Sequence, residues 1–359
     1  MLRKVLTLVS VIVFVTTFSA EAKIWRVNNT PAVNADFTTF NAAVTSASVI
    51  AGDTLYMEPS ATVYTSGSFT MTKRLVVIGP GYFLDPTDAT FPFNPGLQVA
   101  TKDAHISFFR LGPGSDGSKF LGVSLDATVY MSGASNVQFE KCYFGYGTLY
   151  FENGTNDNIS VRKCYFHAAS SIASTTGVTN PVRVITNLIV ENNIFNGGYV
   201  NLDQVTGSGN VFRNNSFYNA GNTQYFSNTY VANNIFGTGG AQNSFINCTV
   251  KNNLFQVNQT LPPTATNNQV SVNMANVYIG GTTGSLDSRV VLKAGSPAIG
   301  AGLTIGAVTS PDCGAYGATD PYKLSGIPNI PSIYSLTVPI SIPSGSTTMN
   351  VTFSTRNNQ

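Results

Sequence analysis

Hydrophobic and polar positions alternate in a short pattern that returns six times between Val137 and Phe255. Its copies read VQFEKCYF, ISVRKCYF, LIVENNIF, NVFRNNSF, TYVANNIF and CTVKNNLF. In each copy the side chains point alternately inward and outward, and two residues then form a turn. The alternation resumes after the turn and ends at the closing phenylalanine. A period of two indicates a β-strand, whereas a helix would place apolar residues every three or four positions. Each copy therefore predicts two short strands joined at a corner.

The distance between copies predicts how these strands assemble. The closing phenylalanines lie 19 to 29 residues apart, at Phe144, Phe166, Phe195, Phe217, Phe236 and Phe255. A unit of this length is too short to bury a core alone, so neighbouring copies must stack on one another. We therefore predict an all-β fold, a parallel β-helix, in which equivalent residues of successive coils form columns.

Asparagine recurs at two fixed positions of the repeat. Eight residues before the phenylalanine it occupies five of the six copies, at Asn136, Asn158, Asn187, Asn228 and Asn247. Two residues before the phenylalanine it occupies the last four copies, at Asn193, Asn215, Asn234 and Asn253. Asparagine tolerates left-handed backbone and can satisfy the amides of turns. We expect the second set to stack as a structural ladder of hydrogen-bonded amides along the axis.

Cysteine takes the ladder position in the first two copies, at Cys142 and Cys164. Neighbouring coils lie about 4.8 Å apart, which brings two stacked cysteines within the range of a disulfide. Two interpretations stay open: a bridge, which an oxidising compartment permits, and a pair of buried thiols that replace the amides. Cys248 and Cys313 occupy other positions, and no cysteine or histidine spacing is typical of a metal site.

The segments that flank the repeats resemble those of a known superfamily. The N-terminal segment DFTTFNAAVTSASVIAGDTLYMEPSATVY resembles the cap helix and first strand of right-handed parallel β-helix, or pectin-lyase-like, proteins. The C-terminal segments KAGSPAIGAG and DCGAYG resemble the end of bacterial surface β-helix proteins with a choice-of-anchor type tail. The resemblance implies a right-handed coil. It transfers no catalytic residue, because the adjacent aspartates and Gly-His-Gly of polygalacturonases and the clustered aspartates of pectate lyases have no counterpart here.

The chain divides into three parts. Residues 1–22 have the charged start, apolar core and Ala-Glu-Ala ending of a secretory signal, which predicts a secreted or cell-surface protein. Residues 23–317 form the β-helix, within which residues 23–56 supply an N-terminal cap and a helix capped by Asp36. Residues 318–359 are rich in proline, and we expect a small C-terminal β extension with a hairpin around residues 343–348, which serves either as a cap or as an attachment element.

Composition narrows the class of partner. Charged residues make up only 10% of the sequence, and the formal net charge is +2. Such a surface lacks the positive footprint that nucleic acid or anionic lipid requires. No segment after the signal is apolar enough to cross a membrane. We therefore expect the partner to be a polysaccharide or a cell-surface glycan. We also expect a monomer without a cofactor, and no cluster of carboxylates suited to calcium is visible in the sequence.

Charges alternate in an outward column four residues before each phenylalanine. The column holds Glu140, Arg162, Glu191, Arg213, Ala232 and Lys251. A carboxylate beside an arginine suits a sugar-cleaving lyase, but opposite charges on neighbouring strands also stabilise an ordinary sheet. We favour the second interpretation, in which each charge is neutralised one coil away.

A second outward cluster is the candidate ligand-binding site. It consists of Lys141, Tyr143, Lys163, Tyr165 and His167. Stacked tyrosines offer a flat face to a sugar ring, and lysines suit uronic or sulfated groups. No partner base is identifiable for His167, and His105, which stands among apolar residues, is expected to be structural.

Three functions fit these observations. The first is a secreted or surface β-helix that binds polysaccharide without cutting it, which the tyrosine and lysine cluster and the lack of a catalytic motif favour. The second is a polysaccharide lyase or glycoside hydrolase whose site has no recognised motif. The third is a structural or adhesive scaffold whose long body acts as a spacer.

Overall fold

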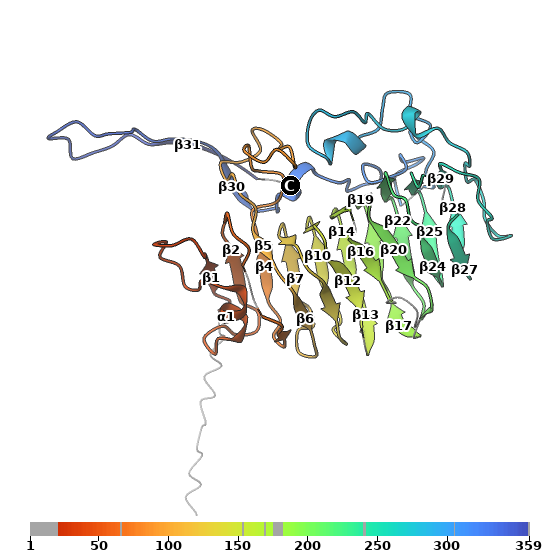
Figure 1. The fold of residues 1–359 in the computed structure, drawn as a ribbon, viewed down its shortest axis with the longest axis horizontal. Coiled ribbons are helices and arrows are strands. Elements are labelled where there is room, and N and C mark those ends of the chain that lie inside the picture. Colours follow the sequence, from red (N-terminus) through yellow and green to blue (C-terminus); the bar gives the residue numbers. More distant parts are fainter. Residues whose placement is uncertain are drawn as a thin grey trace, which may run out of the picture.

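The chain folds into one elongated body of stacked coils. The computed structural model describes residues 21–64, 67–152, 154–168, 170–174, 182–239, 242–304 and 306–357. Three parallel sheets run along this body, and successive coils contribute strands to them (Figure 1). The chain is therefore a parallel β-helix, as the repeat predicts. The secretory signal predicted for residues 1–22 lies almost wholly outside the described residues.

The strands of each sheet follow one another in chain order. The first sheet contains β1 (Ile24–Val27), β2 (Thr54–Met57), β4 (Val76–Ile78), β7 (Lys119–Leu121), β10 (Gln138–Glu140), β14 (Ser160–Arg162), β18 (Ile189–Glu191), β22 (Asn210–Arg213), β25 (Thr229–Ala232) and β28 (Thr249–Lys251). The second contains β5 (His105–Ile106), β8 (Ser124–Leu125), β11 (Tyr143–Phe144), β15 (Tyr165–His167), β19 (Ile194–Asn196), β23 (Ser216–Tyr218), β26 (Ile235–Phe236) and β29 (Leu254–Phe255). The third contains β3 (Thr70–Met71), β6 (Phe109–Leu111), β9 (Val129–Met131), β12 (Thr148–Phe151), β16 (Ser171–Ala173), β20 (Tyr199–Leu202), β24 (Tyr225–Ser227) and β27 (Ser244–Ile246). A small fourth sheet joins β13 (Thr155–Asp157), β17 (Arg183–Thr186) and β21 (Val205–Thr206).

The strand registers confirm the predicted columns. In the second sheet Phe144 pairs with Phe166, and the pairing continues coil by coil to Phe255. Neighbouring rings of this column stack with their centroids 4.4 to 5.0 Å apart. In the first sheet Phe139 pairs with Val161 in the same way. These apolar columns fill the interior of the coil and supply most of its stability.

The asparagine side chains at the ladder position form a continuous chain of hydrogen bonds. Nδ2 of Asn193 donates to Oδ1 of Asn215 at 2.9 Å, Asn215 donates to Asn234 at 3.0 Å, and Asn234 donates to Asn253 at 2.9 Å. The ladder extends one coil further than predicted, since Asn253 donates to Asn268 at 3.0 Å. All of these amides except that of Asn268 are fully buried.

The two cysteines of this column continue the ladder as thiols. All four cysteines of the chain are free, so the disulfide interpretation is wrong. The backbone N–H of Cys142 donates to Sγ of Cys164 at 3.4 Å, and the N–H of Cys164 donates to Oδ1 of Asn193 at 2.8 Å. Burial raises the pKa of the Cys164 thiol well above its ordinary range, so the thiol stays neutral.

The second asparagine column supplies the left-handed turns that lead into the first sheet. Its members share φ angles of 50° to 57°, at Asn136, Asn158, Asn187, Asn228 and Asn247. Gly209 takes the remaining copy with φ of 76°, as expected for a position that needs this backbone. The sequence pattern therefore identifies a real conformational requirement.

One short helix covers the N-terminal end of the coil. It is α1 (Phe40–Thr45), and its Phe40 packs against Phe69 and Phe109 with centroids 5.7 and 5.4 Å away. The N-cap is Thr39, whose Oγ1 accepts the N–H of Ala42 at 3.1 Å. The prediction that Asp36 caps the helix is wrong, because its carboxylate accepts the N–H of Arg26 in β1.

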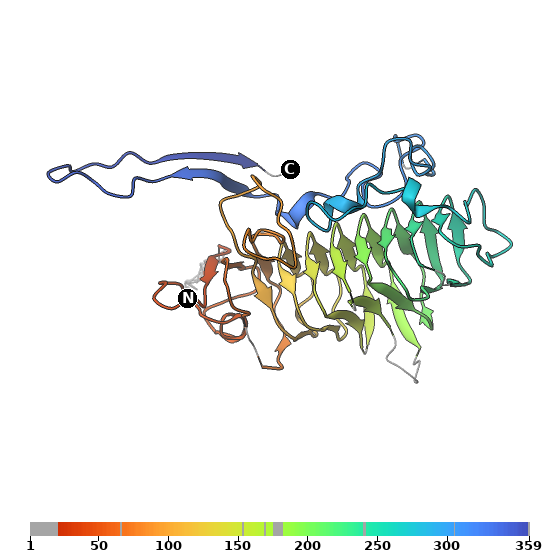
Figure 2. The ribbon, with the colours of Figure 1, turned by 45° about the horizontal axis from the view of Figure 1, so that its top comes forward.

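After Phe255 the chain turns back along the outside of the second sheet (Figure 2). This return path holds three 3₁₀ helices, η1 (Met274–Asn276), η2 (Ser288–Val290) and η3 (Leu324–Gly326). We call residues 301–329 the strap. The stacked strands thus end well before residue 317, the expected limit of the β-helix, and the remainder covers one of its faces.

The strap is held by side chains at one corner of six successive coils. All six have left-handed backbone, and they are Lys141, Lys163, Asn192, Asn214, Asn233 and Asn252. The contacts run in reverse chain order: Asn252 Nδ2 donates to Ala301 O at 2.9 Å, Asn192 Nδ2 to Gly317 O at 2.8 Å, and Lys141 Nζ to Ile327 O at 2.9 Å. The strap therefore runs antiparallel to the order of the coils.

The C-terminal extension is an antiparallel hairpin that projects beyond the N-terminal end of the body (Figure 2). Its strands are β30 (Pro331–Thr337) and β31 (Thr352–Asn357). The hairpin is therefore longer than the small one predicted around residues 343–348. Arg356 tethers it by donating to Gly96 O at 3.2 Å. Across the part of the chain that the structure describes, no helix is both long and apolar enough to cross a membrane.

Candidate functional site

The two lysines of the predicted binding cluster do not face solvent. Lys141 is 2% exposed and Lys163 is 4% exposed, because both stand at the corner that the strap covers. Nζ of Lys163 contacts the carboxylate of Asp320 and lies 3.4 Å from Oε1 of Glu140. Burial lowers the pKa of Lys141 to about 8, to which the neighbouring charge of Lys163 contributes. The prediction of an exposed lysine pair is therefore wrong, since these side chains hold the strap instead.

The tyrosines of the same cluster are also covered. Tyr165 is fully buried and its hydroxyl accepts Nδ2 of Asn196 at 2.7 Å. Tyr143 is 5% exposed, and its ring stacks on that of Tyr165 with the centroids 5.9 Å apart. His167 is half-buried beside Phe91, 5.0 Å between ring centroids, and burial lowers its pKa. The tyrosines stack as predicted, but a loop and the strap lie over the face that was expected to meet a sugar.

The alternating charge column lies on the first sheet, and its central members form ion pairs between neighbouring coils. Glu191 is the shared partner: Arg162 Nε lies 3.0 Å from its Oε1, and Arg213 Nε lies 2.7 Å from its Oε2. These distances agree with the interpretation of the column as a sheet stabiliser.

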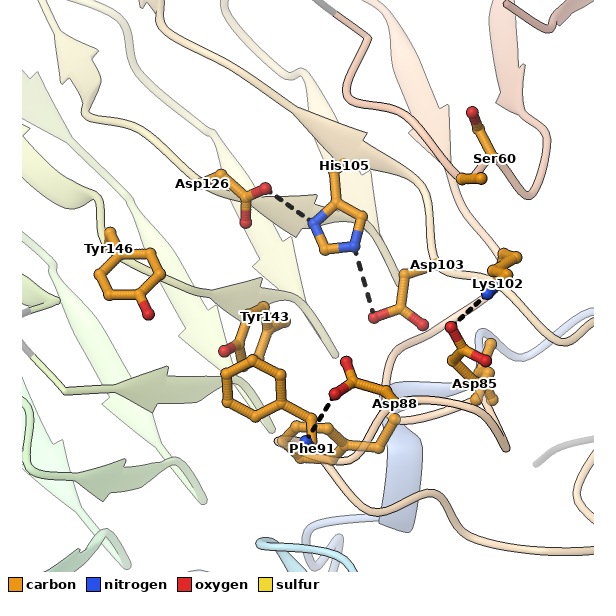
Figure 3. Close-up of a pocket in the computed structure, with 13 residues that line it drawn as sticks. Ser60, Asp85, Asp88, Phe91, Lys102, Asp103, His105, Asp126, Tyr143 and Tyr146 are labelled. Atoms are coloured by element: carbon orange, nitrogen blue, oxygen red, sulfur yellow. Dashed lines mark hydrogen bonds and ion pairs between the residues drawn. The ribbon is translucent and has the colours of Figure 1, made fainter. Parts of the chain in front are cut away.

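A cavity of about 360 Å³ opens between the second sheet and the loop that joins β4 to β5 (Figure 3). The strands supply His105 from β5, Asp126 from just after β8, and Tyr143 from β11. The long loop supplies most of the rest, namely Phe83, Leu84, Asp85, Asp88, Phe91, Lys102 and Asp103. Ser60, Ala61 and Tyr146 complete the lining. This is the candidate functional site.

A histidine between two carboxylates forms the polar wall of the cavity (Figure 3). Nδ1 of His105 lies 2.8 Å from Oδ2 of Asp126, and its Nε2 lies 3.8 Å from Oδ2 of Asp103. The expectation that His105 is structural thus gives way to a place in the candidate site. Its position follows from register, because His105 pairs with Ser124, and Asp126 stands two residues later on the same face.

Burial and charge shift the pKa values of this wall. Burial raises the pKa of Asp103 to about 6, although the charge of His105 and the backbone N–H groups of Leu84 and Phe83 oppose the shift. Burial alone would lower the pKa of His105, but the hydrogen bond to Asp126 and the surrounding carboxylates raise it overall. The wall therefore holds a carboxyl whose pKa is raised to about 6 beside an imidazole whose pKa is also raised.

The loop wall contains two further carboxylates. Asp85 forms an ion pair with Lys102, and this hydrogen bond lowers the pKa of Asp85 to about 2. Asp88 accepts the N–H groups of Thr90 at 2.7 Å and Phe91 at 3.0 Å through Oδ1. Phe91 thereby lies beside Asp88, with an aromatic surface next to a negative charge (Figure 3).

A buried polar cluster outside the cavity holds the loop against the strap. Asp287 is the centre of this cluster: its Oδ2 accepts the N–H of Ser325 at 2.7 Å, and its Oδ1 accepts Nδ2 of Asn94 at 3.2 Å. The hydroxyls of Tyr82 and Tyr322 lie 2.5 Å apart at the same junction. The shape of the cavity therefore depends on the loop and the strap together.

In the ranges that the structure describes, no group of three or more histidine, cysteine or carboxylate side chains is arranged to hold a metal ion. The cavity is lined by side chains that offer hydrogen-bonding groups, charges and aromatic faces.

Comparison with known proteins finds distant structural likeness. No family model and no curated protein matches the chain. Pectate lyase Pel9A is similar in structure, with a TM-score of 0.37 and 15% sequence identity over 82% of this chain and 96% of that chain. QnrB1, a plasmid-mediated fluoroquinolone resistance protein, gives a TM-score of 0.19 and 15% identity over 52% of this chain and 83% of its own. Such superpositions are loose, so the description of the fold rests on this chain's own strand registers.

Proposed function

We propose that this protein is exported and binds a glycan, and that it holds a sugar unit in the cavity between the β4–β5 loop and the second sheet. The observation that carries the proposal is the division of the cavity into an aromatic side and a carboxylate side. Sugar rings present apolar C–H faces and polar hydroxyl edges, so they fit a site with both kinds of wall.

The aromatic side can stack on a ring. Phe91 and Tyr146 flank the imidazole of His167 with their ring centroids 5.0 and 6.2 Å from it. Tyr146 is exposed and Phe91 half-buried, so both present surface to the cavity and to solvent. The aromatic surface proposed to contact a sugar ring is therefore formed by Phe91 and Tyr146, and not by the buried Tyr143 and Tyr165.

The polar side has hydrogen-bonding capacity that the protein does not use. Among the described residues, Oδ1 of Asp103 and the hydroxyl of Tyr143 are buried and have no hydrogen-bond partner. Buried polar atoms are normally paired, and an unpaired one costs about 1–3 kcal/mol. A sugar hydroxyl can donate to the carboxylate and accept from the tyrosine, which would relieve both costs.

One observation also favours a second function, the hydrolysis of a glycosidic bond. Asp103 keeps its proton up to a pH of about 6 and stands beside His105, whose other nitrogen contacts Asp126. A protonated carboxyl can donate to a leaving oxygen while a second carboxylate assists a water molecule. Binding remains the first proposal, because it requires only the walls described above.

Replacing Phe91 with alanine should weaken glycan binding about tenfold, because one stacking face is lost. The measurement uses the chain that begins at Lys23 and its retention on immobilised neutral, amino and acidic polysaccharides. Tyr225→Ala is the matched control, since this tyrosine is exposed on the third sheet, away from the cavity.

The same samples test the two functions against each other. Retention without new reducing ends supports binding, whereas reducing ends that vanish in Asp103→Asn support hydrolysis. Equal retention of wild type and Phe91→Ala would remove the cavity from the proposal. Absence of retention on every glycan would reject the proposal itself.

A further inference from the structure

The charges of the cavity do not balance. Four carboxylates line it, those of Asp85, Asp88, Asp103 and Asp126, against one lysine and one histidine. The charge of Lys102 is neutralised by Asp85, with which it forms an ion pair. His105 is shared between Asp126 and Asp103. Even with a charged imidazole, the cavity keeps a surplus of negative charge when its carboxyls are ionised.

Asp88 is the lining carboxylate that lies outside these ion pairs. Its Oδ1 is fixed by the backbone N–H groups of Thr90 and Phe91, which hold the carboxylate toward the cavity (Figure 3). Among the described residues no lysine, arginine or histidine forms a salt bridge with it. A carboxylate of this kind is free to pair with a cation on a ligand.

The aromatic side favours the same kind of ligand. Phe91 adjoins Asp88, and Tyr146 also lines the cavity (Figure 3). The face of an aromatic ring attracts an ammonium group, by about 0.5–1 kcal/mol at exposed sites and more when water is excluded. The buried hydroxyl of Tyr143, which has no protein partner in the described chain, adds a polar contact at the base.

Anionic sugars lack a corresponding partner. The lysines expected to meet uronic or sulfated groups, Lys141 and Lys163, lie under the strap and bind its residues. The one lysine at the cavity, Lys102, is neutralised by Asp85. A uronic acid would therefore bring its charge close to several carboxylates without a free cation to offset the repulsion.

We propose that the cavity selects a sugar that carries an ammonium group, such as the glucosamine unit of a deacetylated glycan. Asp88 pairs with the ammonium, Phe91 and Tyr146 contact the ring, and Asp103 with Tyr143 meets a hydroxyl. This inference rests on the proposed glycan binding and specifies its ligand class.

The test compares three soluble oligomers of equal length: glucosamine, N-acetylglucosamine and galacturonate. Calorimetry with the chain from Lys23 at pH 7 and low salt should give at least tenfold tighter binding for the glucosamine oligomer than for its acetylated counterpart. Binding of the galacturonate oligomer should be weaker still. Asp88→Asn should reduce the preference for the glucosamine oligomer over its acetylated counterpart about tenfold. Asp116→Asn, an exposed aspartate in another loop, should change neither.

Each outcome separates this inference from the proposed function. Equal binding of the two glucosamine forms, or tighter binding of galacturonate, overturns the ammonium preference while glycan binding stands. An unchanged preference in Asp88→Asn overturns the role of that residue as the ammonium partner. Failure of all three oligomers and of the immobilised glycans overturns the proposed function and this inference with it.

Affinity for the glucosamine oligomer should also rise with pH. The pKa of Asp103, about 6, is set by burial and opposed by His105, while Asp126 raises it and Asp88 faces the same cavity. Above this pH Asp103 is ionised and adds attraction for a cation, until the ammonium loses its own proton. The rise should be larger for the glucosamine oligomer than for the N-acetylglucosamine oligomer, which carries no cation, and the same rise for both oligomers would contradict a charge effect on the ligand.

Discussion

Asn215→Leu should lower the free energy of unfolding by about 4 kcal/mol, among the largest losses available to a single substitution here. Oδ1 of Asn215 accepts both the backbone N–H of Asn193 at 3.0 Å and its Nδ2 at 2.9 Å. Its Nδ2 donates to Val190 O at 3.0 Å and to Asn234 Oδ1 at 3.0 Å. Leucine has a similar volume but leaves these buried groups unpaired, and each costs about 1–3 kcal/mol.

Urea unfolding followed by circular dichroism measures this loss. Asn258→Leu is the matched control, because Asn258 is exposed beyond the last strand and should change stability by less than about 0.5 kcal/mol. Asn268→Leu should fall between the two, since this residue ends the ladder and is half-buried. A loss below about 1 kcal/mol at Asn215 would show that the ladder specifies register rather than stability.

Asp287→Ala should cost about 3 kcal/mol and should also weaken ligand binding in the cavity, which the residue does not touch. The carboxylate accepts from Ser325 N at 2.7 Å, Ser288 N at 2.9 Å, Ser285 Oγ at 2.5 Å and Asn94 Nδ2 at 3.2 Å. Alanine leaves these donors without an acceptor and releases the loop that carries Asp88 and Phe91. Unfolding by urea and calorimetry with the glucosamine oligomer test the two effects.

The stability difference caused by Asp287→Ala should depend on pH. Burial raises the pKa of this carboxyl above its ordinary value of 3.8, so the folded protein holds the proton more tightly than the unfolded chain. The difference between wild type and variant is therefore largest below pH 3.8 and shrinks as pH rises through the raised value. Asp116→Ala, from an exposed loop, serves as the control. Unchanged ligand binding in Asp287→Ala would mean that the loop keeps its shape without this carboxylate.

The body of the fold could be predicted because stacking repeats the same local constraint in every coil. A slip of one residue would turn each side chain to the opposite face, so the column of Phe144 and Phe166 fixes the register. The asparagines from Asn193 to Asn253 make the ladder predictable in the same way. Each buried side-chain amide needs a hydrogen-bond partner one coil away, so asparagine recurs at the same position of each copy. These signals are periodic and therefore visible in the sequence.

The strap and the cavity left no such signal. The strap offers backbone carbonyls to Lys141 and Asn192, and a carbonyl acceptor imposes no residue type on the strap. Alternation alone therefore predicts that Lys141 points outward to solvent, although the strap packs over its side chain. The sequence predicts a structural His105 and gives no site role to Asp126, because the long β4–β5 loop interrupts the repeat before β5. Their one available signal was register, which requires β5 and β8 to be recognised as successive coils.

The strap has a consequence for how this protein can change its length. Each coil advances the axis by about 4.8 Å, and the strap contacts one corner in each of six successive coils from Asn252 back to Lys141. Duplication of one coil would shift every later corner against its carbonyl partner. A viable insertion therefore needs two coordinated changes, a whole coil in the body and about one or two residues of extended chain in the strap. The contacts between the strap and the coil corners thus fix the number of coils.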